Sequence, residues 1–151
     1  ESILIDVTNK IINRFVPLQN NRTFLDKIIY QGKKKYLLDV FLPFKTDKLK
    51  SGYTEKKLAW AETNEEEVWR YFIEKDLLYS SDSDLDKRFI ELAPFSKFFL
   101  ELDNESPGQI GVWLGWQIVR SFMEKNDVSL QELIKIDTQE LFKKSKYKPR
   151  N

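Results

Sequence analysis

Three acidic residues of this chain could carry out acid–base chemistry: Glu65, Asp39 and Glu62. Paired carboxylates catalyse hydrolysis when their environments separate their pKa values and both groups reach the same pocket. The 151 residues include no histidine and no cysteine, which excludes Ser-His and Cys-His catalysis and thiolate or H-E-x-x-H metal sites within this sequence. The enzymatic alternative is therefore a divergent hydrolase, acting on peptides or glycans, that uses Glu65 with Asp39 or Glu62.

Composition argues against several other classes of ligand. The Ser80–Asp84 segment is rich in serine and aspartate, but it lacks the glycine and the distal glutamate of a calcium-binding EF-hand loop. We expect neither a metal nor a cofactor. A net charge of +1 lacks the basic excess that marks nucleic-acid-binding domains. No apolar run approaches the roughly 18 residues that a membrane-spanning helix requires.

A polar pair within a predicted helix over 54–76 is the first candidate for binding. Asn64 falls in the middle of the apolar face and Glu65 at its edge, close to Trp60 and Trp69. A buried polar group without partners costs about 1–3 kcal/mol. The pair is therefore either a satisfied polar cluster of the fold or a set of ligand contacts.

A second predicted helix, from Pro107 to about Glu124, has a glycine side that must pack closely. Ser106 is a suitable N-cap, and Pro107 suits the first helical position. Each glycine costs about 1 kcal/mol in a helix, so another backbone should approach this side, and we expect it near Gly32 of the helix over 23–42. The glycines are Gly108, Gly111 and Gly115.

The opposite flank of this second helix has the character of a binding surface. Trp113, Gln117 and Arg120 share it. The flank is either open to a partner or covered by another segment of the chain. We expect Arg120 to pair with Glu65 across the two helices.

Helical periodicity predicts a mainly α-helical fold that forms a single globular domain over residues 1–151. The helix over 23–42 is apolar on much of its circumference and should be central. Within it, Asp39 either forms a salt bridge with Lys35 or is a buried acceptor that holds another segment. A loop is expected over 44–53. The predicted long helices cover 2–16, 23–42, 54–76 and about 107–124, with short ones after Leu85, Ser129 and Asp137.

Several segments resemble the gliding-motility lipoprotein GldB family of Bacteroidetes. The longest is the Pro-Gly-x-Ile-Gly-x-Trp-x-Gly-Trp-x-Ile-Val-Arg run that ends at Arg120. The resemblance implies the C-terminal half of an exported lipoprotein of the cell envelope, which acts in gliding and the associated secretion machinery. Its lipid-modified cysteine would lie outside this sequence. Further matching segments are Ile29-Tyr-Gln-Gly-Lys33, Tyr36-Leu-Leu-Asp39, Gly52-Tyr53, Ala93-Pro-Phe-Ser-Lys97 and Ser145-Lys-Tyr-Lys-Pro149.

A remoter resemblance is to zinc aminopeptidase-like folds, which have H-E-x-x-H on one helix and Glu-Gly-x-x-x-Tyr on the next. Here Gln31-Gly-Lys-Lys-Lys-Tyr36 falls where the second motif would be, and the Thr8–Ile12 segment falls near the first. Neutral amides and aliphatic side chains do not suit zinc. The resemblance implies a degenerate zincin-like helical core whose metal site is lost.

We therefore expect a non-catalytic interaction or scaffold protein of the cell envelope or periplasm. Its partner would be a protein, without nucleic acid, and it would meet the membrane only through the lipid anchor. We expect the basic 143–150 tail to dock on the domain. If the domain instead only caps an N-terminal half, it should expose an apolar patch and self-associate. The predicted binding residues are Trp60, Asn64, Glu65, Trp69, Trp113 and Arg120.

Overall fold

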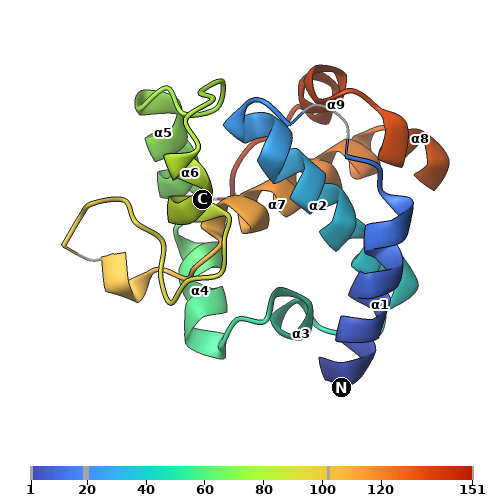
Figure 1. Cartoon of the computed structure of the whole chain (residues 1–151), viewed down its shortest axis with the longest axis horizontal. Helices are drawn as coiled ribbons and strands as arrows, with labels where there is room; N and C mark the ends of the chain where they lie inside the picture. The colour runs from blue at the N-terminus through green and yellow to red at the C-terminus, as the bar shows by residue number, and fades with distance from the viewer. Residues whose placement is uncertain (1, 19–20, 102, 151) are drawn as a thin grey trace.

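Helix α7 (Ile110–Lys125) lies in the middle of the molecule, and the other helices surround it (Figure 1). The computed structural model describes residues 2–18, 21–101 and 103–150, and all regular structure in these ranges is helical. Helices α2 (Phe24–Phe41) and α9 (Thr138–Ser145) pack directly against α7. The prediction of a mainly α-helical, single globular domain is confirmed. The remaining elements are α1 (Ser2–Phe15), α3 (Asp47–Ser51), α4 (Glu55–Thr63), α5 (Glu65–Glu74), α6 (Asp84–Phe89), the 3-10 turn η1 (Asp103–Glu105) and α8 (Leu130–Lys135).

Glycines allow α2 and α7 to come into backbone contact. A methyl group on Gly115 would overlap the carbonyl of Ile28, and one on Gly32 would overlap the carbonyl of Gly115. Gly111 faces the carbonyl of Phe89 in the same way. Because these neighbours are main-chain atoms, a side chain could be admitted only by moving a helix. The predicted approach of Gly32 to the glycine side of α7 is confirmed.

The beginning of α7 differs from the prediction. The helix begins at Ile110, because Gln109 takes a left-handed conformation with φ of 57°. Ser106 is not its N-cap: the buried hydroxyl donates to the carbonyl of Asp103 at 2.6 Å. Pro107 and Gly108 form part of the turn before the helix, where a methyl group on Gly108 would overlap the carbonyl of Ala93. The glycine therefore allows a loop contact, whereas the prediction placed it in a helix.

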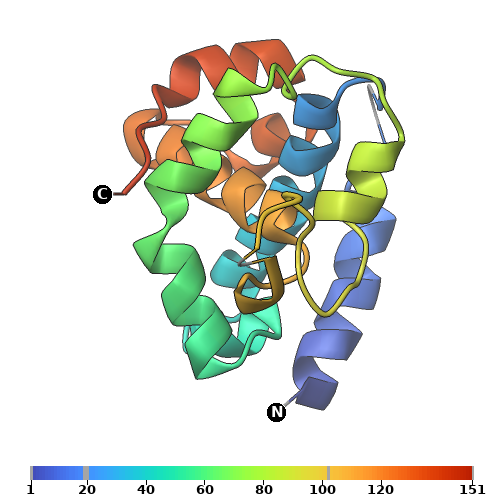
Figure 2. The same ribbon diagram turned by 90° about the vertical axis from the view of Figure 1, so that its left-hand side faces the viewer.

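The predicted helix over 54–76 is divided at Asn64 into α4 and α5, which together form the kinked column seen in Figure 2. Asn64 has φ of −107° and ψ of 15°. Its side-chain amide donates to the carbonyl of Trp60 at 2.9 Å, and its own N–H donates to the same oxygen. Asparagine disturbs helices because its side chain competes for such backbone groups.

A short helix, α3, lies inside the segment that we expected to be a loop. The hydroxyl of Thr46 accepts the N–H of Leu49, which caps the first turn. Gly52 ends the helix in the left-handed conformation, with φ of 76°. Both are ordinary capping signals, but five residues are too few for helical periodicity to appear.

Helix α1 has two apolar faces, and α2 covers one of them. Ile5, Ile12 and the following Val16 are buried against the C-terminal half of α2. The second face remains exposed at the edge of the molecule. Within the described residues, no helix combines the length and apolar character needed to cross a bilayer. The exposed side chains are Ile3, Leu4, Val7, Ile11, Phe15 and Leu18.

Candidate functional site

The predicted binding residues lie in three separate environments. Arg120 joins α7 to α2 and α3 in an ion-pair cluster, and Trp113 packs on Trp116 beside it. Glu65 and Trp69 lie under the C-terminal segment of the chain. Trp60 and Asn64 line an open groove. The prediction grouped these residues into one site because they belong to two predicted helices, over 54–76 and about 107–124. In the structure, the kink at Asn64 and the docked C-terminal segment separate them.

The first environment is a dense ion-pair cluster, called here the Asp39–Arg120 cluster. The Arg120 guanidinium donates to both carboxylate oxygens of Asp39 at 2.8 and 2.9 Å and to both oxygens of Asp47 at 2.9 and 3.0 Å. It also stacks on the ring of Trp116, 3.9 Å from the centroid. The Trp116 indole N–H and the Lys50 ammonium donate to Asp39 at 2.9 and 3.1 Å. Asp39 thus joins α2 to α3 and α7.

These contacts correct one prediction and decide between two others. The expected Arg120–Glu65 pair is wrong, since Arg120 binds Asp39 and Asp47. Lys35 does not bind Asp39 but donates to the carbonyl of Lys50 at 2.7 Å. Asp39 is therefore the acceptor that holds other segments.

The surroundings of Asp39 in the cluster favour the ionised form of its carboxyl group. Burial alone would raise the pKa of Asp39, but the hydrogen bonds and charge of Arg120, with Trp116 and Lys50, hold it below its ordinary value. For Lys35, burial lowers the pKa to about 8; the charge of Lys34 lowers it further, and Asp39 opposes the change. The cluster can fasten three helices, but its charges already have partners.

The flank of α7 around Trp113 is covered. Trp113 is 2% exposed and Gln117 is 7% exposed. The ring of Tyr53, from the segment between α3 and α4, lies 6.2 Å from that of Trp113, and its hydroxyl donates to the carbonyl of Gly108 at 2.7 Å. Of the two interpretations of this flank, a rim covered by another segment is the one observed.

The second environment is the docking place of the C-terminal segment. The Tyr147 hydroxyl donates to Glu65 at 2.6 Å, and the backbone N–H of Arg150 donates to the same oxygen at 3.2 Å. The ring of Trp69 contacts that of Tyr147 edge-on at 5.1 Å. Burial and the charge of Glu65 raise the pKa of Tyr147 above its ordinary value. The predicted docking of the tail is confirmed, and Glu65 is left 3% exposed.

The three carboxylates of the hydrolase alternative do not meet at one place. Glu65 and Glu62 both approach the Arg150 guanidinium, at 4.0 and 3.2 Å, whereas Asp39 is bound by Arg120 and Lys50. Among the residues that the structure describes, no group of three acidic side chains is arranged to hold a metal ion. Acid–base chemistry would therefore depend on the Glu62–Glu65 pair beneath the tail.

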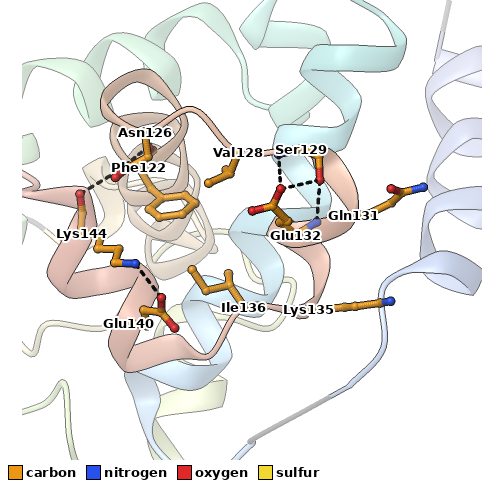
Figure 3. Close-up of a pocket in the computed structure, with 10 residues that line it drawn as sticks. All are labelled: Phe122, Asn126, Val128, Ser129, Gln131, Glu132, Lys135, Ile136, Glu140 and Lys144. Carbon is orange, nitrogen blue, oxygen red and sulfur yellow. Dashed lines mark hydrogen bonds and ion pairs between the residues drawn. The ribbon is translucent and has the colours of Figure 1, made fainter.

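One of the two larger cavities is lined by polar groups that bind one another. It has a volume of about 550 Å³ and lies between the end of α7, α8 and α9 (Figure 3). Lys144 pairs with Glu140 at 2.7 Å, and Ser129 with Glu132 forms the capping box of α8. The side chain of Asn126 donates to the carbonyl of Lys144 at 3.0 Å. These polar groups serve the ends of the helices.

The other cavity, of about 480 Å³, has a different lining and is called here the α4–α5 groove. It lies between the kinked α4–α5 pair and residues 98–100 and 103–105. Trp60 and Asn64 were predicted binding residues. The signals for the other lining residues are weaker: Tyr71 lies on the apolar face of the predicted helix over 54–76, and Phe98 belongs to an apolar segment, 93–99, that is interrupted by Pro94. The lining comprises Trp60, Asn64, Val68, Tyr71, Phe98 and Leu100, with Glu67, Arg70, Glu74, Asp103 and Glu105 around them.

The wall of the groove opposite α5 is held in a fixed turn. Phe99 has φ of 63°, a strained value for a bulky residue that persists only where surrounding contacts enforce it. The Asp103 carboxylate accepts the N–H groups of Phe98, Phe99 and Leu100 at 2.9–3.2 Å. Arg88 donates to the carbonyl of Lys97 at 2.8 Å and stacks on Phe99. The groove is therefore preformed.

Comparison with known proteins identifies the family. A family model described as gliding motility protein GldB matches residues 1–149. No curated protein and no solved structure matches the chain. Since the family match covers almost every residue, the chain belongs to the GldB family of gliding-motility lipoproteins.

Proposed function

We propose that the chain is a non-catalytic interaction protein of the gliding and associated secretion machinery, and that it binds a protein partner in the α4–α5 groove. The full protein would be held in the cell envelope by a lipid on a cysteine outside this sequence, with this domain as its C-terminal part. The observation that supports the proposal is a preformed concave surface lined by Trp60, Tyr71 and Phe98, the kind of lining that binding sites use.

Exposed apolar side chains beside the groove support an interface there. Phe99 is 71% exposed and Leu100 is 62% exposed. The hydrogen bonds from their N–H groups to Asp103 fix the positions of both residues. A fixed apolar rim facing solvent adds little to the stability of the domain, whereas it would be buried by a partner.

The test measures gliding of cells whose full-length protein carries Leu100→Ser. We expect slower gliding or none, with an unchanged unfolding temperature, because Leu100 is exposed and lines the groove. The matched control is Leu92→Ser, which removes a leucine that is 89% exposed and outside the groove; it should glide normally. Normal gliding of the Leu100→Ser cells would overturn the proposed function.

The hydrolase alternative is tested with a separate variant. Glu65 accepts hydrogen bonds from Tyr147 and Arg150, so its charge has a structural role in the docked tail. Peptide or glycan turnover by the chain that disappears in Glu65→Gln would replace the interaction role with a catalytic one. The proposal expects no such turnover.

A further inference from the structure

We infer that the partner of the α4–α5 groove is a basic protein segment, which places an apolar side chain in the groove and Lys or Arg side chains against its rim. The inference rests on the proposed function, since it names the class of partner for the same groove. Two features point to this class: the unbalanced negative charge of the rim, and an apolar floor that includes a tryptophan.

The charged side chains that line the groove are four carboxylates, Glu67, Glu74, Asp103 and Glu105, and one cation, Arg70; a second cation, Lys57, lies beside this rim on the carbonyls of Asn104 and Ser106. Arg70 binds Glu66 and Glu67, each at 2.7 Å, so its charge is used. Asp103 is occupied by three backbone N–H groups. Glu74 and Glu105 are exposed, and within residues 2–18, 21–101 and 103–150 neither side chain takes part in a hydrogen bond or ion pair.

This acidity is local, because the whole chain has a net charge of +1. Carboxylates left without partners around a concave apolar surface attract a cationic ligand and repel anionic ones. Phosphate-bearing partners, such as nucleic acids and anionic lipid surfaces, would meet the same repulsion. A basic segment of a protein satisfies both the charge and the apolar floor.

The floor of the groove can hold both parts of such a segment. Val68, Tyr71 and Phe98 offer an apolar surface, and the volume of about 480 Å³ has room for several side chains. The half-buried Trp60 provides an indole face, and tryptophan is the aromatic residue that binds Lys and Arg cations best. The side-chain N–H of Asn64 donates to the carbonyl of Trp60. Its side-chain oxygen can therefore accept a hydrogen bond from a backbone N–H of the bound segment.

The experiment compares two fluorescein-labelled peptides of about ten residues by fluorescence anisotropy with the purified chain. One alternates Lys with Leu around a central Trp, and the other has Glu in place of every Lys. We expect the basic peptide to bind at least about tenfold more tightly, and its affinity to fall as salt is raised.

A pair of double variants places this binding in the groove. The double variant Glu74→Lys with Glu105→Lys should bind the basic peptide at least about tenfold more weakly, because the rim becomes positive. Glu124→Lys with Asp127→Lys changes the net charge equally at exposed positions outside the groove, and should leave the affinity unchanged. Equal affinity for the two peptides, or equal effects of the two double variants, would overturn the inference.

Gliding of the same variants separates failure of this inference from failure of the proposed function. If Leu100→Ser stops gliding but the Glu74 and Glu105 reversals do not, the groove is an interface whose partner is not basic. If Leu100→Ser cells glide normally, the proposed function itself fails. Loss of gliding in both, with normal gliding of the Glu124 and Asp127 reversals, is the result we expect.

Discussion

The Asp39–Arg120 cluster and the α4–α5 groove both contain residues that the sequence predicted to form one site, yet they differ in what their charges do. Every charged group of the cluster that approaches Arg120 binds within the chain. At the groove, Glu74 and Glu105 are exposed and, among the described residues, have no such partner. A charged side chain surrounded by matched partners supports the fold, whereas unmatched charges around a concave apolar surface leave a place for a ligand.

The largest expected effect is on the contact between α2 and α7. Gly115→Ala would force a methyl group into the carbonyl of Ile28, so α2 and α7 would have to separate. We expect a loss of more than about 3 kcal/mol in the free energy of unfolding, measured by urea denaturation. Gly52→Ala is the control, since no atom lies within 4 Å of the added methyl group. Only the strain of φ 76° remains, which costs about 1–2 kcal/mol. Similar losses in both variants would contradict the close approach.

The next effect concerns the cluster itself. Asp39→Asn would leave Lys50, which is 5% exposed, without its carboxylate and would leave Arg120 with Asp47 alone. Removing one partner of a buried ion pair costs about 3 kcal/mol, again measured by urea denaturation. Glu66→Gln, which breaks the exposed pair with Arg70, should cost less than about 1 kcal/mol. If Asp39→Asn lowers the free energy of unfolding no more than Glu66→Gln does, the cluster does not fasten the helices.

The smallest effect is a pH dependence. Burial lowers the pKa of Lys33 to about 8, with Asp137 opposing, and that of Lys35 likewise to about 8. An unfolded lysine keeps its proton up to about pH 10, so the unfolded chain binds more protons between pH 8 and 10, and stability should rise with pH there. The urea midpoint should increase from pH 7.5 to 9.5, and Lys33→Met should reduce that increase. A midpoint that falls over this range in the unaltered chain would contradict the prediction.

Local signals were sufficient to predict most of the fold. Apolar periodicity located the long helices, and the cost of glycine in a helix predicted the contact between Gly32 and Gly115. Local signals failed where a single residue changed the path of the chain. Apolar periodicity continues on both sides of Asn64 and predicts a helix interior there, although the Asn64 side chain divides that helix.

The site was harder to predict because its charges are paired over long distances in the sequence. Arg120 and Glu65 lie on facing sides of their predicted helices, but periodicity contains no information on which segment reaches them first. Tyr147 reaches Glu65, and Asp39 and Asp47 reach Arg120. Leu100 and Glu105 line the groove because the turn held by Asp103 positions them there. The backbone of such a turn has no periodic pattern in the sequence, so their position could not be predicted.

The contact between α2 and α7 also sets the order in which the chain can fold. Asp39 and Arg120 are 81 residues apart in the sequence, so α2 is synthesised long before the helix that covers it. Contacts between such distant segments form slowly, because the chain loses the entropy of a large loop before the contacts can stabilise it. Until α7 arrives, the apolar face of α2 that packs against it stays uncovered, and exposed apolar surface of this kind makes a partly synthesised chain prone to aggregation.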